Sequence, residues 1–263
     1  QIKTFIIEYL KKNKLTFWLG SWIRIIYHNY VINTLLWINY WLRANGLQNN
    51  TKYEGLKTFK NIHLGKKCYI VGTGPSLRLK DLSFIEGEYS FSVNSIVKLF
   101  DQTSWRPNYL GIQDSHVYKK IETDIAECGI DYKNIFVGSD IYDKYDSAKS
   151  YRPFFHFCCF HREHPEKLKL TTGLSKDFSL IVYDGYSIVY SMLQLAIYMG
   201  FKEIYLMGCD CSYEINKKQH VVESGFYDKQ SLTVGQRMIY AYDYAKRKLI
   251  GSDIKIYNAT NGG

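Results

Sequence analysis

Short apolar runs that end in Gly, Asn or Asp recur along the chain from residue 66 onward. Each has the length of a strand, and they lie at 66–72, 88–94, 107–114, 134–140, 202–210 and 253–260. Stretches of helical character separate them, at 115–127, 186–199 and 232–248. Strands that alternate with helices indicate βαβ units. The pattern therefore predicts an α/β domain over residues 66–263, with a mostly parallel sheet flanked by helices.

The first 50 residues show a different pattern. Residues 15–42 are apolar and aromatic but are interrupted by Arg24, His28 and three Asn, which makes them too polar for a typical membrane span. They predict an N-terminal segment, residues 1–50, of one or two amphipathic helices, followed by a linker at 51–65. Two interpretations of the helices remain open. They pack on the main domain as a hairpin, or residues 1–45 contact the membrane surface through basic side chains. Those side chains are Lys11, Lys12, Lys14, Arg24 and Arg43.

The net charge of +9 is concentrated in the same segment. Residues 1–66 carry ten Lys and Arg against two acidic residues, whereas the remainder carries 24 against 23. A balanced main domain argues against a nucleic-acid partner, and none is expected. Hydrophobic residues make up 46% of the chain, which excludes a disordered protein. A homo-oligomer stays open.

Six cysteines occur without a CxxC pair: Cys68, Cys128, Cys158, Cys159, Cys209 and Cys211. We interpret them as reduced thiols in a cytoplasmic protein, free or peripheral at the inner face of the membrane. No signal peptide is visible. A dense Cys/His cluster lies at residues 156–164, but its members are too close in sequence for a familiar zinc frame. An aromatic loop is the preferred interpretation.

Ligands of parallel sheets bind at the carboxyl ends of the strands, so the polar residues at those ends are the candidates for a site. The first strand runs into Gly72, Thr73, Gly74, Pro75 and Ser76, called the glycine loop below. Two glycines let the backbone approach a phosphate or ribose, and the proline suits a first helical turn. The loop matches neither G-x-G-x-x-G nor a Walker motif. It predicts nucleotide binding, and the alternative is a tight turn that binds nothing.

Further candidates follow later strands. Asn94 and Asp114 can each hydrogen-bond a ligand or cap the next helix. Asp210 can accept ribose hydroxyls, and because position 208 is Gly there is no DxD pair, so no metal is expected. His220 lies in a polar loop, where it is either a general base or a solvated side chain.

The ordered motifs GTGPSL (72–77), SVNS (92–95), IQDS (112–115) and GFKEIYLMGCDCSY (200–213) resemble the bacterial lipooligosaccharide sialyltransferase family. They are also similar to the wider sialyltransferase-like group, which includes 6-hydroxymethylpterin diphosphokinase MptE-like domains. The resemblance covers about residues 66–260. Thr73 and Asp114 stand where the sialyltransferases have Asn.

The resemblance implies a Rossmann-like, nucleotide-sugar-binding catalytic domain at 66–263 and a metal-independent, inverting glycosyltransferase. Its donor would be a CMP-activated, sialic-acid-like sugar, its acceptor a glycan of surface polysaccharide or lipooligosaccharide, and no cofactor is implied. Donor-binding residues carry over as Gly72, Thr73, Gly74, Pro75, Ser76, Asn94, Asp114, Gly208 and Asp210. Tyr213 would hydrogen-bond the leaving phosphate, and His220 would be the catalytic base.

Two other functions remain open. An MptE-like 6-hydroxymethylpterin diphosphokinase would transfer diphosphate from a nucleoside triphosphate and need Mg²⁺. A non-catalytic nucleotide-binding scaffold would keep the fold without turnover.

Overall fold

The structure is a computed structural model, and it describes residues 14–157, 172–211 and 234–261. Seven parallel strands form its central sheet, in the order β5-β4-β3-β2-β1-β8-β9. Their bounds are β1 Lys67–Val71, β2 Ser90–Val93, β3 Tyr109–Ile112, β4 Ile135–Gly138, β5 Arg152–Phe154, β8 Glu203–Met207 and β9 Lys255–Asn258. The predicted α/β, Rossmann-like fold is confirmed.

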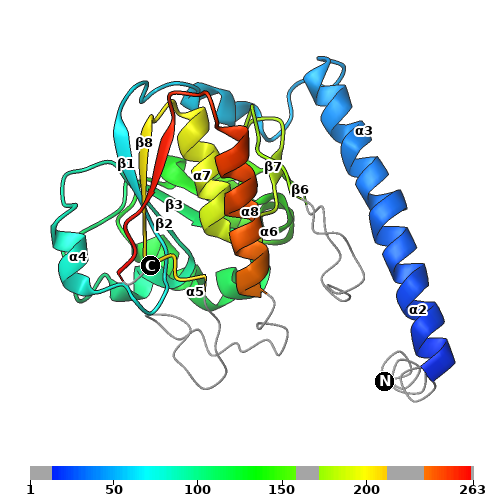
Figure 1. The fold of residues 1–263 in the computed structure, drawn as a ribbon, viewed down its shortest axis with the longest axis horizontal. Coiled ribbons are helices and arrows are strands. Elements are labelled where there is room, and N and C mark those ends of the chain that lie inside the picture. Colours follow the sequence, from blue (N-terminus) through cyan, green and yellow to red (C-terminus); the bar gives the residue numbers. More distant parts are fainter. Residues whose placement is uncertain (1–13, 158–171, 212–233, 262–263) are drawn as a thin grey trace.

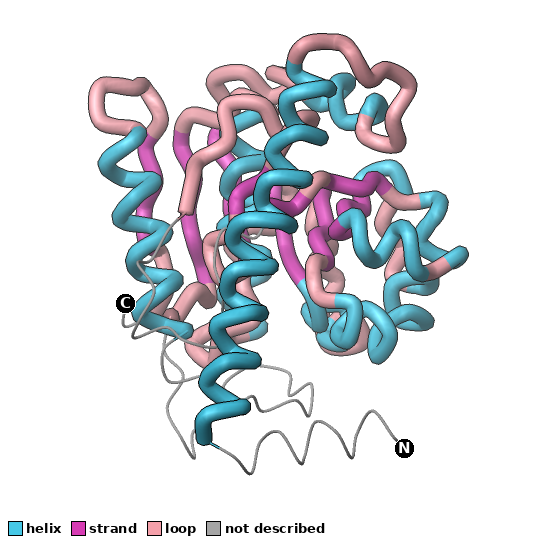
Figure 2. Tube along the Cα trace, turned by 90° about the vertical axis from the view of Figure 1, so that its right-hand side faces the viewer, coloured by secondary structure: helices cyan, strands magenta, loops and turns pink. Residues whose placement is uncertain are grey.

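Helices cover both faces of the sheet (Figures 1 and 2), because alternate side chains of each strand point to opposite faces. In β1, Ile70 lies in one buried cluster and Val71 in the other. The helices on the first face are α7 (Ile188–Tyr198) and α8 (Val234–Lys248). Those on the second are α4 (Leu79–Ser83), α5 (Ser115–Glu127), α6 (Ser139–Lys144) and the 3-10 helix η3 (Asn94–Leu99).

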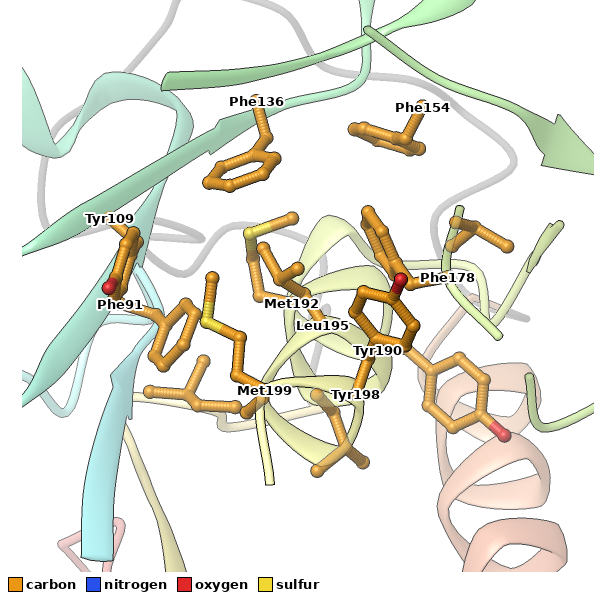
Figure 3. Close-up of a cluster of buried hydrophobic side chains, with 14 of the residues drawn as sticks. Phe91, Tyr109, Phe136, Phe154, Phe178, Tyr190, Met192, Leu195, Tyr198 and Met199 are labelled. Atoms are coloured by element: carbon orange, nitrogen blue, oxygen red, sulfur yellow. The ribbon is translucent and has the colours of Figure 1, made fainter. Parts of the chain in front are cut away.

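Helix α7 lies at the centre of the first face. Ten of its residues are buried, because it is enclosed between the sheet and other elements, including α8. Figure 3 shows Met192 and Leu195 of α7 facing Phe136 from β4. A Cβ added to Gly111 of β3 would lie 2.6 Å from the sulfur of Met192, so the glycine permits this close approach. The helix and the sheet are therefore in tight contact.

The six predicted strands and three predicted helices of the main domain are all present. The sequence pattern did not predict β5, nor the small parallel pair of β6 (His156–Phe157) and β7 (Val182–Tyr183). These strands are only two or three residues long, too short to show a period. Short 3-10 helices, η4 (Tyr132–Asn134) and η5 (Asp146–Ser150), flank β4 and β5.

The N-terminal extension is helical, as predicted. It consists of α2 (Lys14–Ile26), the π-helix η1 (Tyr27–Ile32) and α3 (Asn33–Ala44), which follow one another without a break. Most of this rod stands apart from the main domain (Figure 1). Among the described residues, no helix is long and apolar enough to cross a membrane.

The range 51–65, expected to be a linker, contributes to the core. It contains the 3-10 helix η2 (Glu54–Phe59), whose Leu56 and Phe59 are buried in the cluster around α7. Asn61 and His63 bond through their backbone N–H groups to the carbonyls that end α7. The Asn- and Lys-rich composition concealed these few apolar anchors.

Candidate functional site

The site candidates lie where the sheet changes direction. From β1 the chain adds β2 to β5 on one side, and it then returns to place β8 on the other side of β1. Ligands of open parallel sheets bind at the carboxyl ends of the strands at such a switch point. The glycine loop follows β1, and Gly208 to Asp210 follow β8, so both lie at this point.

Two backbone hydrogen bonds join these segments. The N–H of Gly72 donates to Met207 O at 2.8 Å, and the N–H of Gly74 donates to Gly208 O at 2.9 Å. A Cβ on Gly72 would lie 2.5 Å from Gly208 O, and one on Gly74 would lie 1.8 Å from Asp210 Oδ2. The two glycines are therefore required by close packing of the loop against the end of β8.

Asp210 bonds to the glycine loop through one carboxylate oxygen. Its Oδ2 accepts a bond from the Ser76 hydroxyl at 2.9 Å and a longer one from the Ser76 N–H at 3.4 Å. Among the described residues no donor bonds Oδ1. A carboxylate anchored through one oxygen can accept a further hydroxyl through the other, and the contact of Asp210 with a ribose stays a prediction.

Asn94 begins η3 directly after β2, the strand next to β1. It adopts the left-handed conformation, with φ of 49°, and its buried Oδ1 has no hydrogen-bond partner among the residues that the structure describes. It forms no side-chain cap on the helix, which was the alternative interpretation, because Val93 occupies the cap position without such a bond. Burying an acceptor without a hydrogen-bond partner costs about 1–3 kcal/mol of folding free energy. Such atoms are rare in folded proteins, which makes Asn94 a candidate to bond a ligand.

Asp114 has a local role. It is the N-cap of α5, and its Oδ1 accepts from the N–H groups of His116 at 2.7 Å and Val117 at 3.2 Å. Its neighbour Gln113 accepts a bond from Ser191 of α7 at 2.6 Å, which ties the end of β3 to that helix. Of the two roles that the sequence left open for Asp114, the structure contains the cap, and a donor contact stays a prediction.

The start of α7 is a part of the site that the sequence did not predict. This helix ends beside the beginning of β1, so its N-terminus lies at the carboxyl edge of the sheet. Asp184 is buried there, and its Oδ1 accepts from the Tyr186 N–H at 2.8 Å. The buried guanidinium of Arg237 lies 5.6 Å from the centre of the Tyr186 ring. No sequence motif marks this group, because its members come from separate elements.

Backbone strain is concentrated at the same edge. Among the described residues, five non-glycine residues have positive φ, and three of these, Asn94, Tyr186 and Cys211, lie at or near the carboxyl ends of strands. The two outside this edge are both Asn, the residue type that tolerates this conformation best. Tyr and Cys rarely adopt this conformation, so the backbone is strained at Tyr186 and Cys211. Backbone strain of this kind is typical of functional sites.

A cavity of about 690 Å³ lies between α8 and the edge strand β9, and it extends from the loop before β9 to Asp210 after β8. Its size falls within the range of small-molecule sites. Isoleucines from α8, β9 and nearby loops line it together with Asp243, Lys246 and Asn258. An apolar wall with a few polar groups suits a ligand of mixed character next to the glycine loop.

The thiols at this edge are not nucleophiles near neutral pH. Burial raises the pKa of Cys209 to about 12 and that of Cys211 to about 11. Only the thiolate attacks electrophiles or binds metals, so the raised pKa values disfavour both kinds of chemistry at these two thiols.

Several predicted residues lie outside the described part of the chain. They include Tyr213 and His220, and most of the Cys/His cluster at 156–164, of which His156 is described. Within residues 14–157, 172–211 and 234–261, no group of three or more His, Cys, Asp or Glu side chains is placed to hold a metal ion.

The chain is similar to proteins of known structure at low sequence identity. Among solved structures, it is similar to the MAf glycosyltransferase from Magnetospirillum magneticum AMB-1, at 14% identity and a TM-score of 0.47, over 80% of this chain and 36% of that one. The chain thus spans about a third of that protein. It is also similar to the sialyltransferase CstII from Campylobacter jejuni in complex with cytidine-5'-monophosphate, at 15% identity and a TM-score of 0.34, over 76% and 82% of the two chains.

A comparison with curated proteins found no match. The family described as 6-hydroxymethylpterin diphosphokinase MptE-like matches residues 43–216, which include β1 to β8, the glycine loop and Asp210. The chain therefore belongs to the MptE-like family.

Proposed function

We propose that this protein is a metal-independent, inverting glycosyltransferase whose donor is a CMP-activated, sialic-acid-like sugar. Its acceptor would be a glycan of surface polysaccharide or lipooligosaccharide. The proposal rests on the sequence motifs and on the arrangement of groups at the switch point between β1 and β8.

The observation that carries the proposal is the Asp210 carboxylate held against the glycine loop by Ser76. A carboxylate at this point repels a chain of phosphates and accepts hydroxyl groups, so it suits a ribose. Asn94, at the end of the neighbouring strand, offers a second acceptor for the same nucleoside. A donor with a single phosphate meets less repulsion here than a nucleoside triphosphate would.

The transfer needs a base for the acceptor hydroxyl and a hydrogen-bond donor for the leaving phosphate. The acceptor hydroxyl must lose a proton as it attacks the anomeric carbon, and His220 is the proposed base. The bond between that carbon and the phosphate oxygen breaks, and CMP leaves. The hydroxyl of Tyr213 would stabilise the charge on the leaving phosphate, because the N–H groups of Gly72, Gly74 and Ser76 already donate to acceptors within the protein. Attack from the face opposite the leaving group inverts the configuration.

The cavity beside Asp210 has room for the transferred sugar and part of the acceptor. It lies on the β8 side of the switch point, whereas Asn94 lies on the β2 side. The nucleoside and the sugar would therefore occupy opposite sides of the glycine loop.

The family description favours a second candidate, a 6-hydroxymethylpterin diphosphokinase. That enzyme would bind a nucleoside triphosphate with Mg²⁺ and a pterin in place of the sugar. A non-catalytic scaffold is the third candidate, and it would bind nucleotide without turnover.

Thermal unfolding with a panel of nucleotides separates the three candidates. A ligand that binds only the folded state raises the melting temperature by mass action, by an amount set by its concentration and dissociation constant. The transferase predicts a rise with CMP or CDP that does not depend on Mg²⁺. A rise only with a triphosphate and Mg²⁺ would contradict it and favour the diphosphokinase.

A variant tests the assigned base. In His220→Ala we expect CMP affinity to be retained and turnover of a CMP-sugar to fall about 10²- to 10⁴-fold. His116→Ala, at an exposed position of α5, is the matched control and should keep full turnover. Equal turnover in His220→Ala would remove this residue as the base. CMP binding without any turnover in the wild-type chain would favour the scaffold.

A further inference from the structure

The rod formed by residues 14–44 exposes large apolar side chains that a water-soluble helix would bury. In α2 and η1 the exposed positions recur at intervals of four and form two adjacent rows. One row is Trp18, Trp22, Ile26 and Tyr30, and the other is Leu19, Ile23, Tyr27 and Val31. Their exposed fractions lie between 40% and 70%. Residues four apart share one face of a helix, so the two rows form a continuous apolar stripe.

The stripe continues into α3, where only part of the helix meets the main domain. Leu36 and Tyr40 pack against the core, and the guanidinium of Arg43 lies 4.5 Å from the ring centre of Tyr53 and 4.3 Å from that of Phe155. Other apolar residues of α3 are exposed: Leu35, Trp37, Ile38 and Trp41. Among the described side chains, the rod thus contacts the main domain through α3, and the apolar residues of α2 and η1 are exposed.

The composition of the rod indicates the partner. Residues 14–44 contain three basic residues and no acidic one, and residues 1–66 carry ten basic residues against two acidic ones. Two copies of such a segment would repel each other, whereas an anionic surface would attract it. Four of the five tryptophans of the protein lie in the rod. Trp and Tyr favour the boundary between lipid headgroups and acyl chains.

We propose that residues 14–44 lie on the surface of an anionic bilayer, with the apolar stripe inserted among the headgroups. The basic residues of the N-terminal segment supply attraction to anionic lipid, apart from Arg43, which is buried against Tyr53 and Phe155. The stripe supplies apolar area. This assignment is independent of the transferase proposal, because no residue of the rod contributes to the site at the strand ends.

Vesicle sedimentation of the full chain tests the proposal. We compare vesicles of phosphatidylcholine with vesicles that contain 30% phosphatidylglycerol, at low and high salt. We expect at least tenfold stronger binding to the anionic vesicles and a marked loss of that binding at high salt. Absence of binding, or equal binding to both vesicles, would overturn the proposal.

Substitutions locate the contact. Trp22→Glu combined with Ile26→Glu places two negative charges in the stripe and should abolish vesicle binding. Ile26→Ala with Tyr30→Ala is a milder pair that favours helix formation and should weaken binding several-fold. Phe84→Glu is the matched control, because Phe84 is an isolated aromatic residue with 83% exposure on the main domain, and it should bind as the wild type does. An unchanged far-UV circular dichroism spectrum and a cooperative urea transition in every variant show that the main domain is folded.

Tryptophan fluorescence gives a second readout. Trp105 is buried in the main domain, so in a Trp105→Phe background all tryptophan emission comes from the rod. We expect a blue shift on addition of anionic vesicles and quenching by lipids brominated on the acyl chain. Emission that shifts with protein concentration in the absence of lipid, together with a dimer in analytical ultracentrifugation that Trp22→Glu dissociates, would assign the stripe to a second copy and overturn the proposal.

Discussion

The glycine at position 74 provides the sharpest test of the site. A Cβ at this position would lie 1.8 Å from Asp210 Oδ2 and 2.6 Å from the backbone oxygen of Gly208. The backbone of Gly74 does not have positive φ, so alanine is compatible with its conformation. Gly74→Ala therefore reports the contact between the glycine loop and the end of β8, without a contribution from backbone strain.

Two effects set the size of the loss. The carboxylate of Asp210 can rotate away, but its bonds from the Ser76 hydroxyl and N–H are then broken, which costs about 1.5–3 kcal/mol. The Gly208 oxygen cannot rotate, so the two segments must move apart, and overpacking of this kind costs about 1–3 kcal/mol. Alanine restricts the unfolded chain and restores about 0.4–1 kcal/mol. We expect a net loss of about 1.5–5.5 kcal/mol in the free energy of unfolding.

Nucleotide affinity should fall as well, because the loop that faces the ligand is displaced. We expect at least a tenfold loss, equivalent to about 1.4 kcal/mol. Urea denaturation gives the stability, and isothermal titration with CMP gives the affinity. Gly20→Ala is the matched control, because nothing lies within 4 Å of a Cβ at that position in α2, and it should be neutral or stabilising by up to about 1 kcal/mol.

The reasoning is refuted if Gly74→Ala keeps its CMP affinity within about twofold and its stability within about 0.5 kcal/mol. Should the variant fail to fold, Ser76→Ala tests the same junction more gently. It removes only the hydroxyl bond to Asp210 and should weaken CMP binding several-fold.

Three further predictions concern other parts of the chain. Asn94→Gly removes the unpartnered buried oxygen and relieves the left-handed backbone, so calorimetry should show CMP affinity reduced about 2- to 10-fold with stability unchanged or raised. Burial, and secondarily the charge of Lys66, lowers the pKa of His63, so the folded state binds fewer protons than the unfolded state. The free energy of unfolding should decrease as the pH falls below about 6.5, and His63→Gln should flatten this slope in denaturation curves between pH 7.5 and 5. In Gly111→Ala the new Cβ meets the Met192 side chain, so stability should fall by about 1–2 kcal/mol, and Met192→Val in the same chain should restore part of it.

The local pattern of the sequence was sufficient for six strands and the three longest helices of the main domain, but not for its shorter elements. Apolar runs that ended in Gly, Asn or Asp predicted six strands, and helical stretches predicted α5, α7 and α8, because each depends on the residues within one element. The glycine loop and Asp210 were found as strand-end residues by the same means. The N-terminal helix was predicted from its apolar and aromatic run.

Only the tertiary structure decided which of these ends meet. The contact between Ser76 and Asp210 joins residues 134 positions apart, and it exists because β8 returns to pair with β1. Strand order depends on packing between residues that are far apart in the sequence, including those of α7. The periodicity of apolar positions within one element does not contain that information. The buried anchors Leu56 and Phe59, and the group of Asp184, Tyr186 and Arg237, were missed for the same reason. Each acquires its role from residues distant in sequence, whereas local pattern reports only on neighbours.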